Sequence, residues 1–142
     1  MATRNGSAEW NGDLKGGSGT VRVGEGAFEG NYSFASRFEE GAGTNPEELL
    51  ASAHASCFAM ALSHVMAEDG QSPESVKATA AVHLRNVDGE PTIARIELTA
   101  EGSVPGIDEA QFRAYAEEAK AGCPVSRALG AVPEIELDAR LV

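Results

Sequence analysis

The chain has 142 residues, of which 42% are hydrophobic and 6% are aromatic, and its 22 acidic residues outnumber its 11 basic ones to give a formal net charge of −11. This length fits a single domain over residues 1–142 that buries a core without disulfide staples. The acidic balance argues against nucleic acid as a partner, because a phosphate backbone requires a basic surface. No apolar run approaches the roughly 18–20 residues of a membrane span, and the first six residues lack the apolar core of a signal peptide, so we expect no membrane partner and a cytoplasmic location.

Short strands separated by glycines are predicted for the first third of the chain, and a long helix follows them. The expected strands cover residues 7–10, 20–23 and 31–34, and a loop is expected at 41–43. Asn45 suits an N-cap and Pro46 a first helical position, so we predict a helix from there that ends near Gly70. Thr44 with Glu47 offers the same capping pattern one residue earlier. Its residues are apolar almost all round, which is typical of a helix buried on most sides.

The second half returns to strand periodicity and then to helices. Strands are expected over residues 76–84, 96–100 and 135–141, and helices over 108–120 and 124–129. Strands, a helix, more strands and more helices indicate an α+β class with antiparallel pairing.

The two cysteines are too few for a disulfide framework, so in a reducing cytosol they are either inert core thiols or a redox pair. Cys57 falls within the apolar helix, where position alone favours a small core hydrophobe. Cys123 precedes Pro124 at the start of a helical turn, where unpaired backbone N–H groups stabilise a thiolate and lower its pKa. By position alone, Cys123 is the more activated thiol.

Charged residues near Cys57 have ordinary structural interpretations as well as functional ones. Arg37 follows a predicted strand, where a solvated arginine is common. Glu47 and Glu48 fall in the first turn of the helix, where carboxylates complement its dipole. Glu47 is ten residues before Cys57, so at 1.5 Å per residue about 15 Å separates them along one helix. Glu47 would therefore have to come from a second chain to serve Cys57.

Three histidines complete the candidates. His54 is three residues before Cys57 on the same helical face, where it could polarise the thiol or join it as a metal ligand. No further Cys or His stands at a zinc-like spacing, so we expect no metal site. We interpret His54, His64 and His83 as structural and keep a Cys57/His54 hydrolase as an alternative.

Three segments resemble motifs of the OsmC/Ohr family of thiol-dependent peroxidases. Residues 43–58, GTNPEELLASAHASCF, resemble the signature around the first cysteine, and CPVS at 123–126 resembles the second cysteine box. SRFE at 36–39 resembles the arginine segment of the OsmC branch. The match covers almost the whole chain in order and spacing.

The resemblance implies an intertwined homodimer in which two antiparallel sheets wrap around long central helices, with active sites at the subunit interface. It implies that Cys57 is the peroxidatic cysteine and Cys123 the resolving one, which reverses the order of activation inferred from position. Arg37 would hold the Cys57 thiolate and orient the peroxide, while Glu47 would hold Arg37.

The implied activity is reduction of organic hydroperoxides, and more weakly of hydrogen peroxide, through a Cys57 sulfenic acid and a Cys57–Cys123 disulfide. Its implied role is antioxidant, as part of a stress response. A small or lipoyl-type dithiol would restore the thiols, and no cofactor is implied. Two alternatives remain. One is a non-catalytic dimeric scaffold that binds a ligand or has a stress-related role, and the other is the Cys57/His54 hydrolase.

Overall fold

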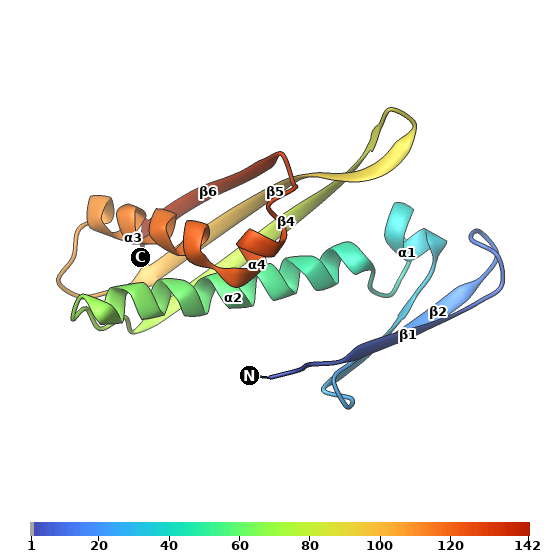
Figure 1. Cartoon of the computed structure of the whole chain (residues 1–142), viewed down its shortest axis with the longest axis horizontal. Helices are drawn as coiled ribbons and strands as arrows, with labels where there is room; N and C mark the ends of the chain where they lie inside the picture. The colour runs from blue at the N-terminus through green and yellow to red at the C-terminus, as the bar shows by residue number, and fades with distance from the viewer. Residues whose placement is uncertain (1) are drawn as a thin grey trace. The chain divides into compact units, whose positions relative to one another are not determined.

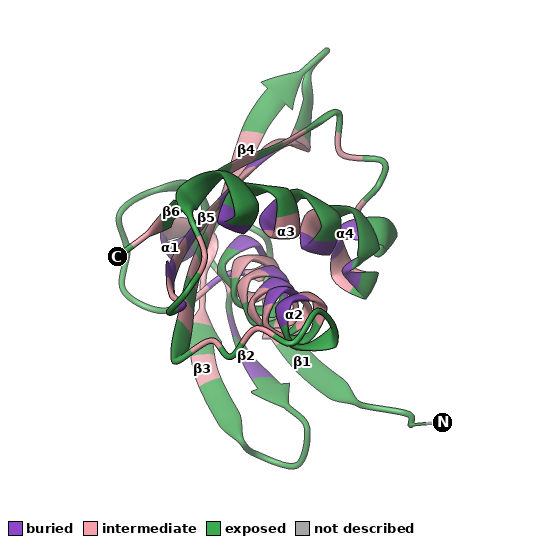
Figure 2. Ribbon diagram, turned by 90° about the vertical axis from the view of Figure 1, so that its left-hand side faces the viewer, coloured by how far each residue is buried: buried purple, intermediate pink, exposed green. Residues whose placement is uncertain are grey.

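The N-terminal part of the chain forms a three-stranded antiparallel sheet. The computed structural model describes residues 2–142, and contacts divide the chain into one unit that ends at Leu49 and another from Leu50 to Val142. In the first unit, β1 (Gly6–Asn11), β2 (Ser18–Val23) and β3 (Phe28–Tyr32) pair in the order β1-β2-β3 (Figures 1 and 2). The single domain expected over residues 1–142 stays a prediction.

Aromatic packing explains a glycine in the middle strand of this sheet. Gly19 pairs with Trp10 on one side and Tyr32 on the other, and the two ring centroids lie 5.2 Å apart. A Cβ at Gly19 would come within 2.5 Å of the Tyr32 ring and 2.7 Å of the Trp10 ring. The rings therefore meet across β2 because the residue between them has no side chain.

A short helix that the sequence did not predict follows β3. The third strand was expected at 31–34, but β3 ends at Tyr32 and α1 covers Phe34–Phe38. The Ser33 hydroxyl accepts from the Ser36 N–H at 3.0 Å, while the Ser36 hydroxyl accepts from the Ser33 N–H at 2.8 Å. This is a capping box made by two serines, without the Glu or Gln by which such boxes are found in a sequence.

The second unit contains a three-stranded sheet and two further helices. β4 (Ser75–Val87) pairs antiparallel with β5 (Glu90–Ser103), and β5 pairs parallel with β6 (Glu134–Leu141). The α+β class is confirmed, but the antiparallel pairing expected for the last strand is wrong. The chain reaches β6 through α3 (Glu109–Gly122) and α4 (Pro124–Ala128), and such a long crossover allows a parallel pair.

The core lies between α2 (Pro46–Glu68), α3 and one face of the β4-β5-β6 sheet (Figures 1 and 2). One stripe of α2 is buried at four-residue intervals: His54, Phe58, Leu62 and Met66. It joins a core that also contains Ile96, Leu98, Ala100, Phe112, Ala116 and Ala119. Burial of α2 on most sides was the wrong expectation for the single chain, because only one stripe meets this core and Met60 is 76% exposed.

The α2 helix also corrects the expectation that no apolar run approaches the length of a membrane span. Its 23 residues are long and apolar enough to cross a membrane when length and composition alone are considered. The core helix of a soluble protein passes the same test, so this observation by itself is weak evidence.

We expect Gly102→Ala to lower the free energy of unfolding by about 1–3 kcal/mol, because a Cβ there would overlap the ring of Phe112 in the core. Chemical denaturation measures the change. Gly122→Ala is the matched control, because nothing lies within 4 Å of a Cβ at this position at the end of α3. The control should leave stability unchanged or raise it by up to about 1 kcal/mol. Equal stability of the two variants would contradict this account of the core.

Candidate active site

The structure brings the two cysteines together. Cys57 lies in the middle of α2, and Cys123 both ends α3 and precedes Pro124, the first residue of α4. Their sulfur atoms are 2.9 Å apart, and both thiols are free. Cys123 is fully buried, whereas Cys57 is partly exposed. A disulfide bond of about 2 Å therefore requires only a small approach of the two sulfurs.

The surroundings of the two thiols separate their pKa values. Burial raises the pKa of Cys57, and the neighbouring Cys123 raises it further. Burial also opposes ionisation of Cys123, but hydrogen bonds from Cys57, from the N–H and hydroxyl of Ser126 and from the N–H of Val125 together lower its pKa. Taken by itself, this arrangement favours Cys123 as the thiol that ionises first, as its position at a helical turn predicts.

Arg37 and Glu47 of the same chain form an ion pair. The guanidinium of Arg37 lies on α1, and its Nη2 donates to Glu47 Oε1 at 2.8 Å while its Nε is 3.2 Å from both carboxylate oxygens. The Glu47 side chain is nearly buried, at 9% exposed, and that of Arg37 is 35% exposed. A bidentate pair of this kind fixes the guanidinium more firmly than a simple surface contact would.

Hydrogen bonds between α1 and the start of α2 hold this pair in place. The Asn45 side chain accepts from the Glu48 N–H at 2.8 Å, as expected for an N-cap, and its amide donates to the Ser36 carbonyl at 2.9 Å. The Ser36 hydroxyl donates to the Thr44 carbonyl at 2.7 Å. The predicted N-cap therefore also anchors the helix that carries Arg37.

An apolar groove opens beside Cys57. It has a volume of about 640 Å³ and lies between α2 and the end of α3. Its lining includes Cys57, Met60, Ala61, Val65, Ala119 and Pro124. A mostly apolar groove that ends on a thiol suits a ligand with an alkyl or aryl portion.

The histidines take three different environments. His54 is fully buried and its Nε2 lies 2.7 Å from the hydroxyl oxygen of Ser126. His64 lies 3.7 Å from Glu68 on the exposed side of α2, and His83 lies 2.8 Å from Glu97 on the sheet. The nitrogen of His54 that makes a contact is thus engaged with Ser126, which weakens its interpretation as a base for Cys57.

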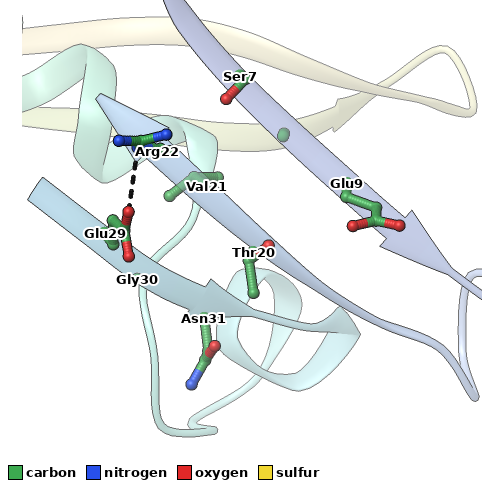
Figure 3. Close-up of a pocket in the computed structure, with 9 residues that line it drawn as sticks. Ser7, Glu9, Thr20, Val21, Arg22, Glu29, Gly30 and Asn31 are labelled. Atoms are coloured by element: carbon green, nitrogen blue, oxygen red, sulfur yellow. Dashed lines mark ion pairs between the residues drawn. The ribbon is translucent and has the colours of Figure 1, made fainter. Parts of the chain in front are cut away.

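A second hollow lies on the polar face of the N-terminal sheet (Figure 3). Arg22 and Glu29 form an ion pair across it at 3.1 Å, and Ser7, Glu9 and Asn31 point from the neighbouring strands. The described residues that line it include neither a thiol nor an imidazole, so we assign it no chemistry.

Ser126 is the residue of the thiol site that sequence reasoning missed. It lies three residues after Cys123, so it is on the same side of the following helical turn. That spacing was the available signal, but nothing in the sequence indicated that His54, from a distant segment, would meet it.

A reduced dithiol beside an apolar groove defines a thiol redox site, and comparisons with known proteins place the chain in a family. The chain belongs to the OsmC-like protein family, which matches residues 39–138. It is 48% identical over 139 residues to the peroxiredoxin OsmC of Escherichia coli, covering 97% of this chain and 96% of the relative.

More distant relatives agree with this assignment. An organic hydroperoxide resistance protein of Xanthomonas axonopodis is 36% identical over 89 residues, which cover 62% of this chain and 61% of the relative. The solved structure of an organic hydroperoxide resistance protein OsmC from Legionella pneumophila superposes with a TM-score of 0.76 and 24% identity, covering 99% of each chain. The OsmC/Ohr fold is therefore confirmed.

We expect each cysteine to change the pKa of the other, and the two changes to have opposite signs. In Cys57→Ala, Cys123 loses a hydrogen bond that stabilises its thiolate, so its pKa rises and less thiolate forms at a given pH. In Cys123→Ala, Cys57 loses a neighbour that raises its pKa, so its pKa falls and more thiolate forms. Titration of the ultraviolet absorbance of the thiolate measures both shifts. Shifts in the same direction would contradict this description of the pair.

Proposed function

We propose that the protein is a thiol-dependent peroxidase that reduces organic hydroperoxides, with Cys57 as the peroxidatic cysteine and Cys123 as the resolving one. The observation that carries the proposal is the 2.9 Å approach of two free thiols beside an apolar groove. The names of the peroxiredoxin and organic hydroperoxide resistance relatives support the same activity. Partial exposure of Cys57 in the groove, against full burial of Cys123, supports Cys57 as the sulfur that meets the peroxide.

The reaction then proceeds in three balanced steps. The Cys57 thiolate attacks the distal oxygen of the hydroperoxide, the O–O bond breaks, the alkoxide leaves as the alcohol after taking a proton, and a sulfenic acid remains on Cys57. The Cys123 thiolate attacks the Cys57 sulfur, the S–O bond breaks, and the leaving hydroxide takes a proton from solvent to become water as the disulfide forms. An external dithiol then reduces this disulfide and is itself oxidised to a disulfide.

Arg37 supplies the charge that Cys57 requires in this scheme. Burial raises the pKa of Cys57, so a nearby cation is needed for its thiolate to be populated at neutral pH. Arg37, held by Glu47 through a bidentate pair, is suited to stabilise that thiolate and to orient the peroxide. The rise of α2 puts about 15 Å between Glu47 and Cys57 of one chain, so the pair acts on Cys57 of a second chain.

A homodimer is part of the proposal. Apolar side chains are exposed in both units of the single chain: Met60 on α2, and Val23 and Phe28 on the N-terminal sheet. These large exposed hydrophobics suit burial against a second copy, and they support interface active sites in an intertwined arrangement.

The preferred substrate, the reductant and the cellular location are further parts of the proposal. The preferred substrate is an organic hydroperoxide, with hydrogen peroxide reduced more weakly, because the apolar groove accommodates an organic group. The reductant is a small or lipoyl-type dithiol, and the location is the cytoplasm, where thiols are kept reduced.

Oxidation by one equivalent of an organic hydroperoxide should remove both free thiols of each chain, because the sulfenic acid on Cys57 condenses with Cys123. Thiol titration before and after addition measures the loss. Cys57→Ser should consume no cumene or tert-butyl hydroperoxide in the presence of a dithiol. Ser56→Ala, which removes an exposed hydroxyl beside Cys57, is the control and should keep wild-type activity. An inactive wild type would leave the non-catalytic scaffold as the better description, whereas an active Cys57→Ser variant would overturn Cys57 as the peroxidatic cysteine.

Mixing inactive Cys57→Ser and Glu47→Ala chains should restore up to about a quarter of the sites, if heterodimers form at random and the two residues meet across the interface. Half of the dimers are then mixed, and each holds one site with both residues intact. Hydroperoxide consumption after unfolding and refolding the mixture measures the rescue. No rescue in verified heterodimers would point instead to a site built from one chain.

A further inference from the structure

We propose that His54 is a positioning residue for the resolving thiol, and that it acts through Ser126 on Cys123 rather than on Cys57. This inference rests on the peroxidase function proposed above and assigns a role to a histidine and a serine that the scheme does not otherwise use. It places them in the second half of the cycle, in which the sulfenic acid is converted to a disulfide.

The geometry forms a chain of three polar groups from α2 to the second cysteine. His54 Nε2 lies 2.7 Å from Ser126 Oγ, and His54 is fully buried while Ser126 is almost so. Ser126 lies three residues after Cys123, on the same side of the turn that begins at Pro124, and its hydroxyl and N–H both lower the pKa of the Cys123 thiol. The imidazole therefore contacts the hydroxyl that stabilises the thiolate of the resolving cysteine.

The second ring nitrogen of His54 favours one direction for the hydrogen bonds in this chain of groups. Among the described residues Nδ1 is buried and has no hydrogen-bond partner. A hydrogen on Nδ1 would be a buried donor without an acceptor, which is rarer in proteins than a buried acceptor without a donor, so we assign the hydrogen of the neutral ring to Nε2. Nε2–H then donates to Ser126 Oγ, which leaves the Ser126 hydroxyl hydrogen free to donate to Cys123. Burial lowers the pKa of His54, which keeps the ring in this neutral form.

This arrangement assists the steps in which Cys123 takes part, and the first of these is formation of the disulfide. When the Cys123 thiolate attacks the Cys57 sulfenic acid, the S–O bond breaks and the S–S bond forms. The Ser126 hydroxyl, fixed by His54, holds the Cys123 sulfur as a thiolate and restricts where it points. The earlier attack of Cys57 on the peroxide involves neither group, so it should not depend on them.

The same contact should assist reduction of the disulfide. A thiolate leaves faster when its pKa is lower, so an external thiolate that attacks the Cys57 sulfur expels Cys123 as the stabilised leaving group. The partial exposure of Cys57, against the burial of Cys123, favours attack at that same sulfur. His54 and Ser126 would thus serve both reactions in which Cys123 takes part.

The test separates the two halves of the cycle in single turnovers without reductant. His54→Leu removes the donor, His54→Gln restores an N–H donor near the position of Nε2, and Ser126→Ala removes only the hydroxyl. His83→Gln is the control, because His83 contacts Glu97 on the sheet. Each variant receives one equivalent of tert-butyl hydroperoxide. Peroxide loss, sulfenic acid trapped by dimedone and detected by mass spectrometry, and disulfide formation are then followed in time.

We expect all variants to consume peroxide within about twofold of the wild-type rate, because Cys57 and its surroundings are retained. His54→Leu and Ser126→Ala should form the disulfide roughly tenfold more slowly, the effect of losing one hydrogen bond, and should accumulate trappable sulfenic acid. His54→Gln should recover most of the rate, and His83→Gln should match the wild type.

The possible outcomes distinguish this inference from the proposed function. A wild type that forms neither sulfenic acid nor disulfide would contradict the peroxidase itself. A working wild type with variants that resolve at its rate, or with variants slowed equally in both steps, would overturn the role of His54. A His54→Gln variant that forms the disulfide as slowly as His54→Leu would also overturn it. If the His54 variants fail to fold, Ser126→Ala decides the question by the same criterion.

Discussion

The candidate site depends on the packing of α2 against the junction of α3 and α4. Phe58, Leu62 and Met66 anchor one stripe of α2 in the core, and this fixes the rotation of the helix. Cys57, next to Phe58, is then directed toward the edge of the core where α3 ends. Cys123 stands at that end because Pro124 begins a new helix there. The 2.9 Å separation of the sulfurs is therefore a consequence of hydrophobic packing rather than of attraction between thiols.

The two thiols are unequal because burial affects them differently. Burial and the neighbouring Cys123 raise the pKa of Cys57, and a hydrogen bond from the backbone of Val125 offsets this only in part. Cys123 is more deeply buried, but the backbone N–H groups and the hydroxyl at the start of α4 compensate. A site that forms a disulfide and is then reduced benefits when Cys123 has the lower pKa, because the stabilised thiolate is also the better leaving group. The thiol that meets the peroxide then needs a cation from elsewhere, and the Arg37–Glu47 pair is the preformed candidate.

Much of the fold was predictable because its signals are local. The N-cap at Asn45, the helix through Cys57 and the alternation of β4 and β5 each follow from residues within a few positions of one another. The misses have different causes. The α1 helix is capped by serines alone, and the parallel pairing of β6 follows from the length of a crossover that periodicity does not reveal.

The sequence alone determined the family motifs, the two cysteines and the ion-pairing residues, because each is a residue type at a fixed spacing. It also indicated that the helical turn after Cys123 favours a thiolate. The tertiary structure decided which groups meet. Only the packed core brings Cys57 to Cys123, and only it sets His54 against Ser126, since both contacts join segments that are more than sixty residues apart in the chain. Contacts between distant segments depend on the rotation and offset of packed helices, which no local pattern encodes.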